Sequence, residues 1–405
     1  MLRPMAVPGQ ERTVARAQGL SLDVENLLES LQTTNIGLAV WQPSDIRKIM
    51  EKLAKLCVFC GGKVISKTKE HVIPRWLMQM TGDPKRNVNF QVFLPHGQGR
   101  NRNFSFDSFQ FPACDSCNNN FAKLEGRAKT VVEKLLSRAG ISGIEWTTLL
   151  DWLDKVRIGI WLGTRSLDKN YVAVEPLFHI ANRMRTKDRS LIIATARHGQ
   201  RLSFFGSNSL TFRFMPSCFG LLINDIGLVN VSHEFLLSRR MGFPYGQDLR
   251  RESDRIRSYV PAPGRNRIMR PPLGGSVSGW GTIVHQCIFK NWQNSTFAHY
   301  WQSDYVTSNS QDHVGGLSVP FLETQSGSVY PCTESSTSWV PTHTFDTTAS
   351  LGQYLARRCF DLQQWLIEDW PDRVDTKEEK MQARKFVRLL HKELEGMRFA
   401  IKEMQ

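Results

Sequence analysis

Two Cys-x-x-Cys pairs constrain the fold of this chain more than any other feature of its sequence. Cys57 and Cys60 lie in the segment CVFCGG, and Cys114 and Cys117 lie in the segment CDSCNN. A CxxC turn directs two thiolates at one point, and two such turns complete the tetrahedral sulfur site that zinc prefers. The spacing therefore predicts that these two distant segments fold around one structural Zn²⁺ ion.

Two other uses of paired cysteines agree less well with the sequence. A single CxxC pair is typical of thiol–disulfide enzymes, but two pairs flanking a compact segment are not. Disulfides are rare in the cytoplasm. We expect a cytoplasmic protein without membrane contact, because the N-terminus lacks the apolar core of a secretory signal and no apolar run reaches the roughly 20 residues of a membrane span. The cysteines are then reduced thiols or metal ligands.

The charge balance favours a polyanionic partner. Lys and Arg number 52 against 38 Asp and Glu, which gives a net charge of +14. The excess lies in residues 1–140 and 181–270, whereas 141–180 and 271–405 are slightly acidic. Nucleic acid and an anionic membrane surface both fit this balance, and so does a basic surface that only aids solubility.

An acid–histidine pair lies between the two cysteine pairs. Glu70 and His71 are adjacent, Pro74 follows three residues later, and Asn118 comes directly after Cys117. Glu-His alone is common by chance. The order CxxC, acid-His, CxxC-Asn is a far more specific pattern.

The segment from Cys57 to about Glu125 resembles the HNH, or ββα-metal, endonucleases, and most of all the zinc-containing branch represented by phage endonuclease VII. In that family a β-hairpin carries the acid–His pair, and a helix after the second CxxC carries the Asn. The zinc holds hairpin and helix together and takes no part in catalysis. The resemblance covers only this segment and implies nothing about the other residues.

The resemblance implies a role for three residues. His71 matches the general base that activates water, and Glu70 and Asn118 match the two protein ligands of one catalytic divalent cation. A neutral imidazole can accept a proton near neutral pH. Carboxylate and amide oxygens suit Mg²⁺ or Mn²⁺, which stabilises charge on the phosphate in the transition state. The implied products carry a 5′-phosphate and a 3′-hydroxyl, and family likeness favours DNA over RNA.

Several details depart from the family pattern. Glu70 replaces the more usual Asp or His, and residues 80–103 are expected to form an inserted loop. Asn119 could share the metal with Asn118. Glu125 lies seven residues after Asn118 on the same helical face, so it is either a further metal ligand or an exposed helix acid. The group that orients His71 is not identified.

Basic side chains crowd the same segment and are expected to contact phosphates. The expected nucleic-acid contacts are Lys67, Lys69, Arg75, Lys123 and Arg127. The Arg-rich tract within 239–270 is either a second nucleic-acid surface or a solvated loop. The four other cysteines lack metal spacing and are expected to be core thiols: Cys218, Cys287, Cys332 and Cys359.

The fold class expected is α+β, with a ββα-metal HNH module followed by a region of mixed helix and strand. The segments expected are a helical lead at 1–40, the HNH domain at 41–140, a mixed domain at 141–345 and C-terminal helices at 346–405. Helices are predicted over 20–33, 43–56, 118–137, 147–163 and 349–368, with a last helix that opens with a capping box from Thr376 to Glu379. Strands are predicted over 104–111, 202–206, 210–215, 219–225 and 226–232, and a Pro/Gly-rich loop over 261–281.

The functional hypothesis from the sequence is a metal-dependent endonuclease with a nucleic-acid partner. A role in bacterial defence follows only by analogy. The C-terminal region is expected to serve substrate choice, homo-oligomerisation or contact with a regulatory partner. The alternative hypothesis is a zinc-stabilised module that binds nucleic acid or protein without catalysis, and it leaves Glu70, His71 and Asn118 unexplained.

Overall fold

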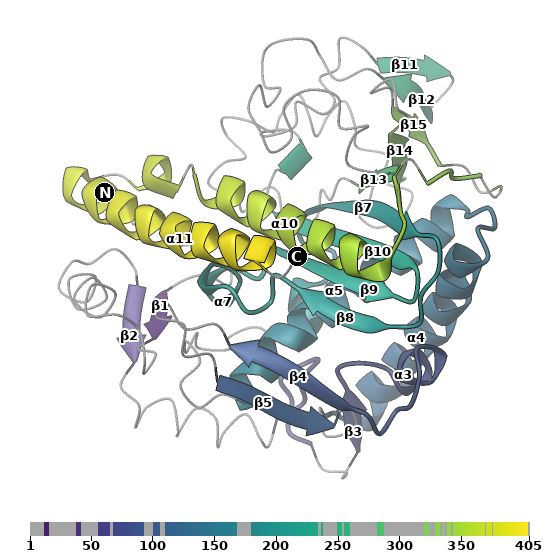
Figure 1. Ribbon diagram of the computed structural model, residues 1–405, viewed down its shortest axis with the longest axis horizontal. Coiled ribbons are helices and arrows are strands. Elements are labelled where there is room, and N and C mark those ends of the chain that lie inside the picture. The colour runs from purple at the N-terminus through teal and green to yellow at the C-terminus, as the bar shows by residue number, and fades with distance from the viewer. Residues whose placement is uncertain are drawn as a thin grey trace.

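The architecture was obtained as a computed structural model, which is α+β (Figure 1). The structure describes residues 12–15, 38–41, 56–64, 68–92, 100–105, 110–167, 180–233, 236–237, 249–252, 255–259, 282–286, 320–323, 329–332, 335, 338–341, 343–368, 370–374 and 376–403. Within these residues, no helix combines the length and the apolar character that crossing a bilayer requires.

The largest element is a ten-stranded sheet centred on β7 (Asp188–Ala196), of which every residue is buried. Neighbouring strands on the main path pair antiparallel, and β16 (Thr344–Phe345) adds to β7 in parallel. The order along the path is β11 (Leu249–Glu252), β12 (Arg255–Tyr259), β15 (Val329–Pro331), β14 (Phe321–Glu323), β13 (Thr282–Gln286), β7, β10 (Ile226–His233), β9 (Cys218–Ile223) and β8 (Leu202–Phe205). Burial on both faces means that helices cover both sides of its centre.

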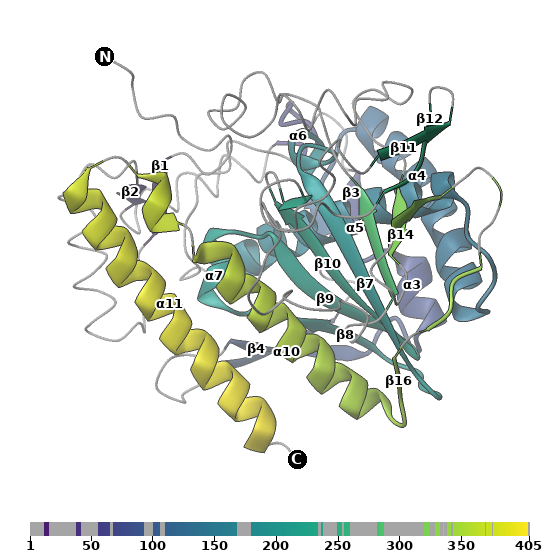
Figure 2. The same cartoon turned by 90° about the horizontal axis from the view of Figure 1, so that it is seen from above.

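A long C-terminal helix covers one face of this sheet, and a second long helix packs beside it (Figures 1 and 2). Helix α10 (Thr348–Ile367) packs directly on the sheet, and α11 (Lys377–Glu403) packs on α10 and on the short helix α7 (Leu210–Phe214). The 3-10 helix η7 (Trp370–Arg373) links α10 to α11. Gly227 of β10 permits the close approach of α10, because a Cβ there would lie 2.8 Å from both Cδ atoms of Leu355.

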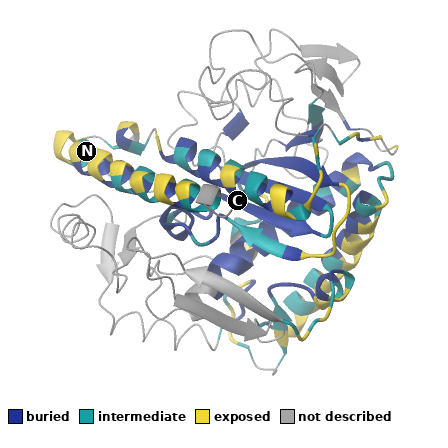
Figure 3. Cartoon of the chain, viewed as in Figure 1, coloured by how far each residue is buried: buried dark blue, intermediate teal, exposed yellow. Residues whose placement is uncertain are grey.

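Helix α5 (Gly143–Leu167) lies on the other face of the sheet, and every residue from Asp151 to Gly163 is buried (Figure 3). A helix that is buried on all sides must pair any charge it carries. Towards the sheet it does so through two acids: Arg189 of β7 lies 2.8 Å from Asp151 and 2.9 Å from Asp154. Arg157 completes this buried network 2.7 Å from Asp154.

A small ββα unit packs against the far side of α5. Strands β3 (Lys69–His71) and β6 (Gln110–Pro112) pair antiparallel, and α4 (Asp115–Leu136) follows β6 almost at once. Between the two strands lie α3 (Arg75–Met80) and an antiparallel hairpin of β4 (Asn87–Val92) and β5 (Arg100–Ser105). Helix α6 (Ile180–Arg183) follows α5. One continuous apolar core extends from Cys57 to Trp339.

Most of the predicted elements that fall on described residues are confirmed. Helix α4 begins three residues before the predicted start, and α5 and α10 cover their predicted ranges. The capping box of α11 is present: Thr376 Oγ1 accepts from the N–H of Glu379, and Glu379 Oε2 accepts from the N–H of Thr376, both at 3.1 Å. Strands β8, β9 and β10 match the predictions for 202–206, 219–225 and 226–232.

Two local predictions are wrong. Residues 210–215 alternate like a strand but form α7, because the Ser209 side chain caps Phe212 N at 3.0 Å and Glu393 of α11 accepts from Leu210 N. Much of the loop expected over 80–103 is instead the hairpin β4–β5. Of the strand predicted over 104–111, residues 104–105 end β5 and 110–111 lie in β6, whereas 106–109 lie outside the described residues.

Other predictions fall partly or wholly outside the described residues. These are the helices at 20–33 and 43–56, the loop at 261–281, and much of the Arg-rich tract. In the N-terminal lead the structure describes β1 (Arg12–Ala15) and β2 (Leu38–Trp41), which pair in parallel. The division into four segments stays a prediction.

Glu393 of α11 leads to a prediction about pH. Its Oε1 accepts from the N–H of Leu210 at 2.8 Å, whereas Oε2 is buried with no hydrogen-bond partner among the described residues. Burial raises the pKa of this carboxyl to about 7, although the Leu210 N–H and the charge of Arg213 oppose the shift. Since the unfolded carboxyl titrates near 4.5, the folded state binds the extra proton between these values, and stability falls as the pH rises from about 4.5 to about 7.

Glu393→Gln should therefore remove this fall and raise the free energy of unfolding at pH 8 by up to about 3 kcal/mol, since one pKa unit corresponds to about 1.4 kcal/mol. Urea unfolding of both proteins at pH 5 and pH 8 measures the effect. An equal loss of stability with pH in both proteins would contradict the assignment to Glu393.

Candidate functional site

The first cysteine pair sits on a tight turn that precedes β3. Cys57 N–H donates to the carbonyl of Gly62 at 2.8 Å, and Gly61 N–H donates back to the carbonyl of Cys57 at 2.9 Å. Gly61 adopts φ of 75°, a conformation that glycine takes without strain. Val58 N–H also donates to the carbonyl of Pro112 at 2.9 Å, which ties this turn to β6.

The second pair begins helix α4. Cys114 is the N-cap residue and Cys117 lies in the first turn, so both thiols stand at the positive end of the helix. The ring of Phe59, from the first turn, stacks on Phe121 of α4 with centroids 3.8 Å apart and planes 12° apart. This contact holds the two cysteine turns against each other.

The four cysteines converge on one point. Their sulfur atoms all lie within 4.8 Å of one another, and Cys60 Sγ is 3.9 Å from Cys114 Sγ. Zn–S bonds of about 2.3 Å place two sulfurs of a tetrahedral site about 3.8 Å apart. The cluster therefore fits a structural metal ion such as zinc, as the spacing of the cysteines predicts.

The surroundings of the cluster also influence the ionisation of its thiols, which must be thiolates to bind a metal. Burial alone would raise the pKa of Cys57, but backbone N–H groups of Cys114, Cys60 and Phe59 donate to its sulfur and bring the pKa down to about 7. Burial raises the pKa of Cys117. One thiolate is thus favoured by the protein, and a divalent cation would supply the positive charge that the other sulfurs need in order to ionise.

His71 lies at the end of β3, opposite Gln110 of β6. The amide Nε2 of Gln110 lies 2.8 Å from His71 Nε2, and the ring is half-buried. When the amide donates this bond, the neutral ring carries its proton on Nδ1 and has its lone pair on Nε2. Gln110 was not predicted from the sequence. Its contact with His71 follows from the register of β3 and β6, which places the two residues opposite each other. The sequence alone does not give this register.

Glu70 is not free. Its Oε1 makes an ion pair with the ammonium of Lys155, and Oε1 of Glu125 makes a second ion pair with the same ammonium. The Lys155 side chain is 1% exposed, and each carboxylate is 13% exposed. Lys155 Nζ also lies 5.8 Å from the centre of the Phe59 ring. Glu125 is therefore not an exposed helix acid, which corrects one of its two predicted readings. Burial raises its pKa, and Lys155 opposes this.

Asn118 is half-buried in the first turns of α4, and its N–H donates to the carbonyl of Cys114 at 2.9 Å. It shares a helical face with Glu125, two turns later, and Asn119 is exposed.

Of the predicted phosphate contacts, four are exposed on β3, α3 and α4: Lys69, Arg75, Lys123 and Arg127. The fifth, Lys67, lies outside the described residues. Among the other cysteines, Cys218, Cys332 and Cys359 are buried free thiols, as predicted, and Cys287 lies outside the described residues.

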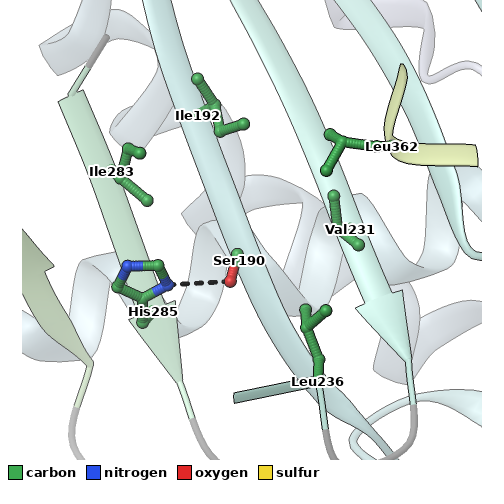
Figure 4. A pocket seen from close by; sticks show the side chains of 7 residues that line it. All are labelled: Ser190, Ile192, Val231, Leu236, Ile283, His285 and Leu362. Carbon is green, nitrogen blue, oxygen red and sulfur yellow. Dashed lines mark hydrogen bonds between the residues drawn. The ribbon is translucent and has the colours of Figure 1, made fainter. Parts of the chain in front are cut away.

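A second polar cluster lies inside the sheet (Figure 4). His285 of β13 lies 2.9 Å from the Oγ of Ser190 through Nδ1 and 2.7 Å from Oε2 of Glu323 through Nε2. This is the composition of a hydrolytic triad. The adjoining cavity measures only about 10 Å³ and is lined mainly by apolar side chains, which is room for at most one water molecule. The cluster therefore joins β13 to β7 and β14 and offers no space for a substrate.

The cysteine cluster leads to a prediction about metal content. Wild-type protein is expected to hold about one zinc per chain, and Cys114→Ala to lose it, because three thiolates leave one corner of the tetrahedron open. Elemental analysis of the dialysed proteins measures this. Cys332→Ala, which removes a buried thiol outside the cluster, is the matched control and should retain the metal. Zinc retained by Cys114→Ala would refute a four-sulfur site.

Comparison of the chain with protein-family models, with curated proteins and with solved structures finds no match, so its activity has to be argued from the site itself.

Proposed function

We propose that the chain is a metal-dependent endonuclease of the HNH type, with β3, β6 and α4 as its ββα module. The observation that carries the proposal is the position of His71 on β3, where Gln110 of the paired strand β6 contacts its Nε2. His71 stands on a strand whose partner leads directly into the cysteine cluster and α4. The same helix brings Asn118 into the module. A half-buried imidazole whose Nε2 is contacted by a neighbouring side chain is arranged like a positioned base.

The proposed chemistry is hydrolysis of a phosphodiester. His71 accepts a proton from water, displacing Gln110 from Nε2, while the water oxygen bonds to phosphorus. The bond from phosphorus to the 3′ oxygen breaks, and that oxygen takes a proton from solvent. The products are a 5′-phosphate and a 3′-hydroxyl. Exposed Lys69, Arg75, Lys123 and Arg127 would hold the backbone on either side.

The charge of the site supports a divalent cation as cofactor. Two carboxylates, those of Glu70 and Glu125, share the one ammonium of Lys155. The second carboxylate oxygen of Glu70 and the amide oxygen of Asn118 would hold this divalent cation, and Asn119 could add a further amide oxygen. Such hard oxygen donors suit Mg²⁺ or Mn²⁺. When bound, this ion would stabilise the charge that develops on the phosphate and on the leaving oxygen.

One observation favours the second candidate, a zinc-stabilised module that binds nucleic acid or protein without catalysis. The Glu70–Lys155 ion pair is buried, and it joins the carboxylate that the proposed cation would use to a buried lysine. If this pair is permanent, Glu70 is structural. The cysteine cluster and the exposed cations would then serve binding alone.

His71→Ala separates the two functions. The nuclease proposal expects wild-type protein to cut plasmid DNA with Mg²⁺ or Mn²⁺ and not with EDTA. It expects His71→Ala to be at least about 100-fold slower, the usual contribution of a general base. Zinc content and melting temperature should be unchanged. His198→Ala removes an exposed histidine from the turn after β7 and is the matched control, expected to cut like wild type. Equal cutting by His71→Ala, or none by any protein despite intact zinc and DNA binding, would sink the proposal.

A further inference from the structure

Helix α11 carries a row of cations that neither the fold nor the proposed active site uses. Lys380, Arg384, Arg388 and Lys392 follow one another at intervals of four residues, and therefore lie along one side of the helix at steps of about 6 Å. Arg384, Arg388 and Lys392 are exposed, and Lys380 is half-buried. Exposed Lys377 and Lys385 lie beside the row. The outer side of α11 is exposed along its length (Figure 3).

The row shares its side of α11 with the exposed acid Glu395, three residues after Lys392, and keeps a net positive charge. None of its four members makes an ion pair with a described carboxylate; the recorded contact is a hydrogen bond from Arg388 Nε to the carbonyl of Arg384, at 3.4 Å. By contrast, Arg398 near the end of the same helix does pair, 3.0 Å from Asp361 of α10. Like charges four residues apart destabilise a helix. The row is therefore not explained by the stability of α11.

The opposite side of α11 is already occupied. Phe386 lies edge-on to Phe214 of α7 at 4.9 Å between centroids and to Trp370 of η7 at 5.2 Å. Leu390 and Leu394 are fully buried. A helix that binds a membrane surface inserts its apolar side into the lipid. Most of that side of α11 is buried against protein. The outer side exposes Met381 and Phe399 among its charged residues, but these two lie 18 positions apart, about 27 Å along the helix, and form no continuous apolar stripe.

We propose that the row Lys380–Arg384–Arg388–Lys392 binds the phosphate backbone of a nucleic acid along α11. The identification of the polyanion rests on the proposed nuclease function, and the row adds a second contact surface outside the ββα module. A linear series of cations matches an extended polyanion and gives affinity without reading sequence.

The test is the salt dependence of binding in the absence of cleavage. Binding of a fluorescein-labelled duplex DNA is measured in EDTA with the His71→Ala protein, over a series of salt concentrations. The row is then removed by changing Lys380, Arg384, Arg388 and Lys392 together to Gln. The slope of log K against log salt is negative, and each lost phosphate contact makes it shallower by about 0.9. Its magnitude should therefore decrease by about 3 to 4 when the four cations are removed. Glu378→Gln with Glu395→Gln removes two exposed charges of opposite sign from α11 and is the matched control, expected not to reduce the slope.

An unchanged slope after removal of the row would overturn the proposal, as would stronger binding to phosphatidylserine vesicles than to DNA. Circular dichroism checks that the four-Gln protein keeps α11, which relief of like-charge repulsion should favour. The experiment distinguishes failure of this proposal from failure of the nuclease proposal. If the four-Gln protein loses DNA binding, the surface on α11 is supported even when no variant cuts DNA. If wild type cuts DNA and the slope is unchanged, only the surface is refuted.

Discussion

The Lys155 ammonium is the contact on which the arrangement of the candidate site depends. It is almost completely buried on α5, and it joins Glu70 of β3 to Glu125 of α4. A buried charge with no partner is strongly unfavourable, so the positions of all three side chains are coupled. Lys155 therefore fixes the strand that carries His71 relative to the helix that carries Asn118. The cysteine cluster adds a second constraint at the start of that helix.

Helix α5 extends this constraint to the ten-stranded sheet. Lys155 faces the ββα unit, whereas Asp151 and Asp154 face the sheet, where Arg189 binds both. Ion pairs on both sides of one buried helix set its rotation and its depth, which apolar contacts alone specify less sharply. One continuous apolar core joins the cysteine turns to the sheet, so the candidate site packs on the same core as the central strands.

Local patterns were sufficient to predict part of this structure. The cysteine spacing predicted the four-sulfur cluster, and helical periodicity predicted α4, α5, α10 and α11, because these signals depend on neighbours in sequence. The helix α7 and the roles of Gln110 and Lys155 depend on tertiary contacts. A lysine in the apolar helix LLDWLDKVRIGIWLG does signal a buried ion pair, since such a helix is buried all round. Its partners follow only from the packing of α5 against β3 and α4.

The central claim is that Lys155 holds the candidate site together, and the free energy of unfolding of Lys155→Met tests it most directly. The account predicts a loss of about 3 kcal/mol or more, because two partly buried carboxylates lose the cation that pairs with both of them. Adding Glu70→Gln and Glu125→Gln should restore much of that stability. Lys129→Met, which removes an exposed lysine 3.8 Å from Glu133 on the same face of α4, should cost less than about 1 kcal/mol. If Lys155→Met were no more destabilising than Lys129→Met, the ion pairs would not organise the site and the account would be wrong.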